Sequence, residues 1–350
     1  MRPRALLVVL LVALAASGCG RKRQKGASYN ADRVAASGSG VCAAMRDGTL
    51  RCWGDVPGVT GRGVPEVVDP GPGVKEACVG RGFACDVSGG AVRCARAGAF
   101  EPIAGVAGVT ALSCERSRAC AIDGAGKVAC WAMTDGPRAA EGVAGIEGAT
   151  ALGSGGDATC AVVTGGALRC FGDNRDGVLG DGTTEPRAGV VTAKIEGAVR
   201  VAIGARHACA RRADETVWCW GRNDQGQLGD GGRTDRFTPA PTSNLAGVDD
   251  VSAGDAHACA RMKDSTVRCW GDAAHHQVGR STSTEDVLVA ALVPGLYEAT
   301  AVACGGAFSC ARMKDGWLRC WGANEAGQLG EGSDMERAVP VPIRYPAIAP

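Results

Sequence analysis

Aromatic side chains are scarce in this sequence of 350 residues, which has only 5 Phe and 3 Tyr. Cysteines separated by two residues are missing altogether, although this spacing is the usual signature of a structural zinc site. The apolar run Ala5–Ala16 is far too short to span a bilayer as a helix, and no other apolar run is long enough. These absences argue against a zinc-binding protein and against a chain that crosses a membrane several times.

Basic charge is also in short supply once the N-terminal segment is set aside. The formal charge of the whole chain is +1, but six of its 38 basic residues fall within the first 25 positions. The remaining 32 face all 37 acidic residues, so the rest of the chain carries a net charge near −5. A mildly acidic domain lacks the positive surface that nucleic-acid binding requires, and we expect no nucleic-acid partner.

Catalytic signatures are missing as well. The sequence has no nucleophile elbow, no phosphate-binding Gly-x-x-x-x-Gly-Lys motif and no pair of carboxylates that stands apart from its repeat. We therefore expect the protein not to be an enzyme, with no catalytic residues, no cofactor and no metal ion.

The N-terminus resembles that of a bacterial lipoprotein. Residues 1–18 read as a signal peptide with a short apolar core, and Ala16-Ser17-Gly18-Cys19 resembles the lipobox, in which the cysteine is acylated. An ordinary signal peptide with an incidental cysteine is the alternative. Residues 19–30 are basic and read as a lipidated flexible tether. The pattern predicts a location in the cell envelope, lipid-anchored to a bacterial membrane on the periplasmic or cell-surface side.

Glycine is abundant, and it indicates how the rest of the chain is organised. The 54 glycines recur at regular intervals, which predicts many tight turns, and no long segment keeps a helical apolar period. Residues 31–350 exceed the usual size of a single hydrophobic core. A repeat architecture within one domain resolves this, and one unit does recur seven times. The copies are Cys42–Gly54, Cys85–Cys94, Cys120–Trp131, Cys160–Gly172, Cys209–Gly221, Cys259–Gly271 and Cys310–Gly322.

Each copy reads as a β-hairpin that places its two cysteines opposite each other. If Arg46-Asp47-Gly48 is a three-residue loop, counting back from the turn puts Cys42 opposite Cys52. Directly opposed residues of antiparallel strands lie within disulfide reach, and an exported protein meets an oxidising compartment. The same count predicts the disulfides Cys42–Cys52, Cys120–Cys130, Cys160–Cys170, Cys209–Cys219, Cys259–Cys269 and Cys310–Cys320.

The second copy tests this argument because its cysteines are one residue closer together. Its turn, Gly89-Gly90, suits a two-residue loop, and Cys85 again falls opposite Cys94. Glu215 and Ser265 occupy the glycine position of two other turns, so those loops either have four residues or carry mild strain.

Three further cysteines precede their hairpins by six or seven residues and are expected on the innermost strand. Cys78 and Cys114 fall in adjacent copies, so they either bridge these copies or stay as two buried thiols, and we favour the thiols. Cys304 makes the number odd, which leaves at least one thiol free or modified.

Beyond the hairpin, the fifth copy continues Trp220-Gly221-Arg222-Asn223-Asp224-Gln225-Gly226-Gln227-Leu228-Gly229, and the fourth and seventh read similarly. This W-G-x-N-x-x-G-Q-L-G pattern resembles the repeat of the regulator-of-chromosome-condensation (RCC1) family. The resemblance implies an all-β fold, a seven-bladed propeller with four antiparallel strands per blade around a central channel. Copies one to three lack the loop, the sixth is degraded at Asp272–Arg280, and Ala338–Ile343 is expected to close the ring against the first blade.

The remaining candidate residues have structural interpretations. His207 and His257 occupy a repeat position, which predicts packing within the blade, and His275 with His276 read as a solvated loop rather than a metal site. The tryptophans that follow the second hairpin cysteine are expected to pack within their own blades; they are Trp53, Trp131, Trp220, Trp270 and Trp321.

Two functions compete for such a chain. The first is a non-catalytic envelope lipoprotein whose monomeric propeller binds a protein or surface-glycan partner, with the membrane as a second partner through the lipid. The alternative is an extracytoplasmic enzyme with a site at the channel mouth. Guanine-nucleotide exchange, the activity of the family's founder, is disfavoured by the expected export and by the short early copies.

Overall fold

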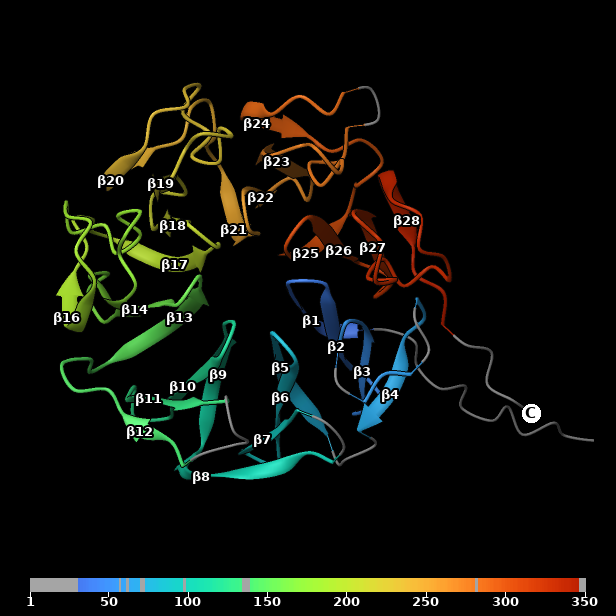
Figure 1. The fold of residues 1–350 in the computed structure, drawn as a ribbon, viewed down its shortest axis with the longest axis horizontal. Helices are drawn as coiled ribbons and strands as arrows, with labels where there is room; N and C mark the ends of the chain where they lie inside the picture. The colour runs from blue at the N-terminus through green and yellow to red at the C-terminus, as the bar shows by residue number, and fades with distance from the viewer. Residues whose placement is uncertain are drawn as a thin grey trace, which may run out of the picture.

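The computed structural model describes residues 31–56, 58–60, 63–69, 73–96, 99–133, 139–280 and 283–345. The expected signal peptide (1–18) and tether (19–30), with Cys19, lie outside the described residues. Within that part of the chain, seven four-stranded antiparallel sheets stand in a ring around a central channel (Figure 1). The fold is the seven-bladed β-propeller that the repeat predicts. No helix among the described residues is long and apolar enough to cross a bilayer.

Each blade is one contiguous stretch of chain whose strands follow one another outward from the channel. Blades one to three contain β1 (Ala31–Ser37), β2 (Gly40–Met45), β3 (Leu50–Gly54) and β4 (Glu66–Asp69); β5 (Val74–Gly80), β6 (Phe83–Ser88), β7 (Ala91–Ala95) and β8 (Glu101–Ala107); and β9 (Val109–Cys114), β10 (Arg118–Asp123), β11 (Val128–Ala132) and β12 (Glu141–Gly142). Blades four and five contain β13 (Ala149–Gly155), β14 (Ala158–Val163), β15 (Leu168–Gly172) and β16 (Arg187–Thr192); and β17 (Ala198–Ile203), β18 (His207–Arg212), β19 (Val217–Gly221) and β20 (Arg236–Pro241). Blades six and seven contain β21 (Val248–Ala253), β22 (His257–Met262), β23 (Val267–Gly271) and β24 (Val287–Leu292); and β25 (Ala299–Cys304), β26 (Phe308–Met313), β27 (Leu318–Gly322) and β28 (Arg337–Pro342).

The turns between second and third strands follow the sequence prediction. Gly89 and Gly90 both have positive φ angles, 60° and 82°, as a two-residue hairpin loop requires. Glu215 and Ser265 keep the three-residue loop and adopt the left-handed conformation themselves, with φ angles of 67° and 66°. Of the two alternatives for these turns, mild strain is therefore the correct one.

The hydrophobic core lies between neighbouring blades, because each sheet is covered by the next one around the ring. One buried cluster, for example, combines Val217 of blade five, Val267 of blade six and Trp321 of blade seven. All six residues of β2 are buried, and they include Ala, Val, Cys and Met but no aromatic residue. Small side chains at these positions let adjacent sheets approach closely, which explains the scarcity of Phe and Tyr.

The ring closes differently from the sequence expectation. Ala338–Ile343 does not join the first blade, because β28 pairs with β27 as the outer strand of blade seven. Instead β1 packs beside β25 (Figure 1), and the backbone N–H of Ala31 donates to the carbonyl of Gly316 at 3.0 Å. The corresponding bond joins the other neighbouring blades, such as the Ala198 N–H to the Gly166 carbonyl at 2.9 Å. Blades one and seven thus meet like any other pair.

Candidate functional site

A disulfide bond joins the second and third strands of every blade. The two cysteines of each hairpin are directly opposite in the strand register, with Cα atoms 4.1 Å apart. The bonds join Cys42–Cys52, Cys85–Cys94, Cys120–Cys130, Cys160–Cys170, Cys209–Cys219, Cys259–Cys269 and Cys310–Cys320. The local count from the turn therefore identifies the same partners as the structure.

An eighth disulfide corrects the sequence analysis. Cys78 and Cys114, for which we favoured two thiols, form a bond between the innermost strands of blades two and three. Only Cys304 is free among the described cysteines, and its burial raises the pKa of its thiol to about 11. A buried thiol with such a pKa is almost entirely protonated at neutral pH and is a poor nucleophile.

The repeated tryptophans hold neighbouring blades together rather than packing only within their own. The indole N–H of Trp270, on blade six, donates at 2.9 Å to the backbone carbonyl of Gln227 in the loop of blade five. Three equivalent bonds run from Trp220 to Val178, from Trp321 to Gln277 and from Trp53 to Gln328. We call these four contacts the indole latches. The last one joins blade one to blade seven across 275 residues of sequence and helps to close the ring.

The N-x-x-G-Q-L-G loop is the structure that each latch holds. In blade five, the side-chain carbonyl of Asn223 accepts the backbone N–H of Leu228 at 3.0 Å, and its amide donates to Asp230 at 3.1 Å. Blade six has Ala273 in place of this asparagine, yet its Gln277 carbonyl still accepts the latch from Trp321. The loop that looks degraded in sequence therefore keeps its position.

Two histidines at a repeat position are buried and neutral. His207 and His257 are both fully buried, and burial lowers the pKa of their imidazoles to about 4 and about 3. Nε2 of His257 lies 2.9 Å from the hydroxyl of Ser309 on the next blade, whereas neither ring nitrogen of His207 has a hydrogen-bond partner. His207 packs within its blade, as predicted, whereas His257 also contacts the next blade through Ser309.

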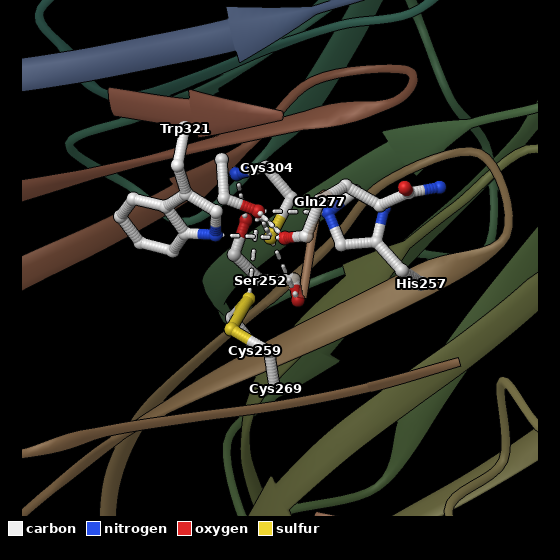
Figure 2. The surroundings of a disulfide bond; sticks show 8 residues. Ser252, His257, Cys259, Cys269, Gln277, Cys304 and Trp321 are labelled. Atoms are coloured by element: carbon white, nitrogen blue, oxygen red, sulfur yellow. Dashed lines mark hydrogen bonds between the residues drawn. A yellow bond between two sulfur atoms is a disulfide. The ribbon is translucent and has the colours of Figure 1, made fainter. Parts of the chain in front are cut away.

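A sulfur-rich cluster surrounds the disulfide of blade six (Figure 2). His257, Cys259 and Cys304 offer ligand atoms within 4.8 Å of one another, as do Cys78, Cys85 and Cys114 at the junction of blades two and three. In both groups, however, disulfide bonds already engage sulfurs, which removes thiolate ligands for a metal ion. Neither group is a convincing metal site in this oxidised state.

His275 and His276 lie at the junction of blades six and seven. Their ring nitrogens are 3.4 Å and 4.0 Å from the carboxylate of Glu336, which belongs to the loop of blade seven. The His275 and Glu336 side chains are each about half exposed. His275 is therefore solvent-exposed, as predicted, whereas the His276 side chain is only 19% exposed, and both histidines lie close to Glu336 of the adjacent blade.

The two ends of the propeller differ in character. At the end of β19, Gly221 lies opposite His207 at the start of β18. The turns after first strands and the long loops after third strands therefore share one face, which we call the loop face. The opposite face, which we call the hairpin face, carries the hairpin turns and the connections between blades.

A cleft of about 830 Å³ opens on the loop face where blades six, seven and one meet. Its described lining residues contain three carboxylates and neither lysine nor arginine, so the cleft is acidic. Its polar side chains come from all three blades and include Asp55, Thr60, Asp255, His275, Glu325 and Gln328. Sequence reasoning did not find this cleft, because its residues become neighbours only when the ring closes.

A smaller cavity of about 400 Å³ lies at the channel mouth on the same face. Glu115 lines it, is 3% exposed and forms an ion pair with Arg118 at 2.9 Å. Burial raises the pKa of the Glu115 carboxyl to about 7, although the Arg118 guanidinium opposes this shift. Burial also raises the pKa of Asp255 at the mouth, against the lowering effect of Arg116. Carboxyl groups with raised pKa values can transfer protons near neutral pH.

Family comparisons agree with the repeat pattern. A family model described as the regulator of chromosome condensation (RCC1) repeat matches residues 214–261, and a second of the same description matches 198–227, 248–277 and 299–328. The chain carries RCC1 repeats. These matched stretches of RCC1 repeat lie in blades five to seven. A comparison with curated proteins gives no match.

Solved structures share the architecture of these RCC1 repeats. Prp20p from Saccharomyces cerevisiae has a TM-score of 0.74 at 16% identity, over 86% of each chain. Human WBSCR16 has a TM-score of 0.72 at 18% identity, over 81% of this chain and 85% of that one. The ectodomain of the Arabidopsis thaliana receptor kinase ACR4 has a TM-score of 0.56 at 17% identity, over 90% of this chain and 99% of its own. At these identities the likeness concerns the fold alone.

Proposed function

We propose that this protein is a non-catalytic envelope lipoprotein, anchored through Cys19, whose propeller is a scaffold for a protein or surface-glycan partner. The lipobox-like N-terminus and the disulfide in every blade support an exported location. The yeast propeller Prp20p is described by its binding to Gsp1p and histones, which supports a protein partner by analogy.

The cleft on the loop face is the observation that carries this proposal. It is built by three blades, three carboxylates converge in it, and its size suits a peptide segment or a few sugar rings. Asp55, Asp255 and Glu325 favour a partner that presents basic groups or hydroxyl donors.

Site-specific crosslinking in intact cells tests the scaffold. A photo-reactive residue at Glu325, in the cleft, should give a discrete adduct, whereas one at Thr216, on the hairpin face, should not. The adduct should weaken in an Asp55→Lys background, because reversing this charge repels a basic partner. Equal adducts from both faces, or an adduct indifferent to Asp55→Lys, would contradict the proposal.

The lipid anchor has a separate test. Metabolic labelling with a fatty acid should place label on the chain, and the label should disappear in Cys19→Ala. A labelled Cys19→Ala variant would rule out this attachment site.

An extracytoplasmic enzyme is the second candidate, and Glu115 is the observation that favours it. Its raised pKa at the channel mouth would suit a general acid. Hydrolysis of a glycan or ester substrate by the purified protein, lost in Glu115→Gln but kept in Asp86→Asn, would replace the scaffold proposal. If the purified protein hydrolyses neither glycan nor ester substrates, the enzyme candidate is wrong and the role of Glu115 is its ion pair with Arg118.

A further inference from the structure

Blade seven carries two exposed aromatic side chains on the hairpin face. Tyr297 is 63% exposed and Trp317 is 39% exposed, in a protein that otherwise buries most of its aromatic rings. Both positions recur in the other blades with small or polar residues. Trp317 corresponds to Thr49, Ala91, Lys127, Ala167, Thr216 and Thr266, and Tyr297 corresponds to Glu147, Glu196 and Ala246. The aromatic pair is therefore an exception to the repeat rather than a product of it.

The chain enters the propeller beside Trp317. The backbone N–H of Ala31 donates to the carbonyl of Gly316 at 3.0 Å, and the guanidinium of Arg312 donates to the carbonyl of Ala31 at 3.2 Å. Trp317 also packs edge-on against Tyr345, with ring centroids 5.4 Å apart. Trp317 thus lies beside Ala31, the first described residue. Tyr297 is linked to the same hairpin through its neighbour Glu298, whose backbone carbonyl accepts the N–H of Lys314 at 2.9 Å.

The length of the segment between Cys19 and Ala31 limits how far this face can be from a lipid on Cys19. Twelve residues span at most about 40 Å when fully extended, and less as a flexible coil. Because Ala31 starts on the hairpin face, the shortest path to a bilayer brings that face toward the lipid and turns the loop face away. Trp and Tyr are the side chains that favour the boundary between headgroups and acyl chains.

We infer that Trp317 and Tyr297 form a membrane-interface contact that seats the propeller on phospholipid, hairpin face down, beside its own anchor. Lys314, whose side chain is 75% exposed next to this pair, can reach headgroup phosphates, since its ion pair with Glu298 is itself solvent-exposed. The acidic cleft then points away from the bilayer, toward a partner in solution or on another surface. This inference rests on the proposed lipid anchor and adds an orientation to it.

Fluorescence quenching by lipid tests the seating directly. The full lipidated chain, purified from membranes, is reconstituted into phosphatidylethanolamine–phosphatidylglycerol vesicles with or without brominated acyl chains. Five of the seven tryptophans are at most 2% exposed, so only Trp317 and the half-buried Trp218 can contribute strongly. Brominated lipid should quench the wild-type protein, Trp317→Phe should lose that quenching, and the control Trp218→Phe should keep it.

Flotation of the same vesicles distinguishes the lipid anchor from the contact of the aromatic side chains with the membrane. Protein that floats with the vesicles but is not quenched, or is quenched equally in Trp317→Phe, would overturn the seating and leave the lipid anchor intact. Protein that does not float would count against the anchor and the seating together. Tyr297→Ser should reduce the quenching of Trp317, because a weaker contact leaves the indole more often in water, and unchanged quenching would exclude Tyr297 from the contact.

Discussion

Blades four to seven and blades one to three reach the same architecture by different means. From the interface of blades four and five around to that of seven and one, an indole from one blade latches the loop of the preceding blade. The early blades have lost this loop. Trp131 is buried without a partner for its indole N–H, while Ala95 and Phe171 occupy the tryptophan position in blades two and four.

Covalent and charged contacts stand where the latches are missing. The Cys78–Cys114 disulfide joins blades two and three, and the guanidinium of Arg118 lies over the ring of Phe171 at 5.2 Å between blades three and four. At the junction of blades six and seven, only one of the two positions that correspond to this disulfide holds a cysteine. There Cys304 corresponds to Cys114, and Ser252 corresponds to Cys78. A propeller interface can therefore do without the loop when another contact spans it.

Removing the interblade disulfide should have the largest effect. The Cys78→Ser, Cys114→Ser double variant opens a loop with a sequence separation of 36, against 10 for a hairpin disulfide. Chain entropy then predicts a loss of about 4 kcal/mol in unfolding free energy, against about 3 kcal/mol for the control pair Cys160→Ser, Cys170→Ser. Urea unfolding measures both. A smaller loss from the interblade pair would show that blades two and three do not depend on their bridge.

Replacing a buried histidine by the phenylalanine of an early blade should alter the acid stability. His207 has a folded-state pKa of about 4, below its unfolded value near 6.5. Between pH 6.5 and pH 4 the histidine is protonated in the unfolded chain but stays neutral in the folded protein. The unfolding free energy therefore falls by about 3 kcal/mol as the pH is lowered to 4. His207→Phe copies Phe83 of blade two and should remove this loss.

Unfolding measured at pH 7 and pH 4 checks the histidine prediction. His257→Phe, which copies Phe308, is the matched variant for the histidine that contacts Ser309. If His207→Phe keeps the full acid sensitivity of the wild type, the titrating group lies elsewhere.

Completing the bridge at blades six and seven should stabilise the protein. The backbone N–H of Cys304 donates to the hydroxyl of Ser252 at 3.0 Å, so a thiol at this position would face Cys304 as Cys78 faces Cys114. Ser252→Cys should form a disulfide and consume the free thiol. We expect it to add about 2 kcal/mol to the unfolding free energy, less than the value of about 4 kcal/mol that chain entropy gives for a separation of 52, because the hydrogen bond that the Ser252 hydroxyl accepts is lost. Mass spectrometry and thiol titration decide the outcome, and Ser113→Cys, at the same repeat position, should leave Cys304 free.

The smallest expected difference in unfolding free energy comes from removing single indole N–H groups. Trp270→Phe leaves the buried carbonyl of Gln227 without its donor and should cost about 1 kcal/mol more than Trp131→Phe, which removes a donor that has no partner. Thermal or urea unfolding of the two variants provides the comparison. Equal losses would mean that ring packing, and not the hydrogen bond, is what the latch contributes.

Local patterns were predictable because their partners lie close in sequence. The pairing of Cys85 with Cys94 follows from a two-residue turn, and the register confirms the same opposition. The position of Trp270 under a loop of the preceding blade was not predictable, because its partner Gln227 lies 43 residues away and belongs to the loop of another blade. For the same reason the expectation of two thiols at Cys78 and Cys114 was wrong.

The number of blades and the partner of each hairpin cysteine can be read from the amino-acid sequence, since strand pairing across a short turn leaves little freedom. The indole latches, the interblade disulfide and the closure of the ring, in contrast, follow from the packing of one blade on the next. These contacts depend on the angle between successive sheets, and that angle brings residues as distant as Trp53 and Gln328 together. The acidic cleft and the exposed aromatic pair belong to this second class, because both lie where the two ends of the repeat array meet.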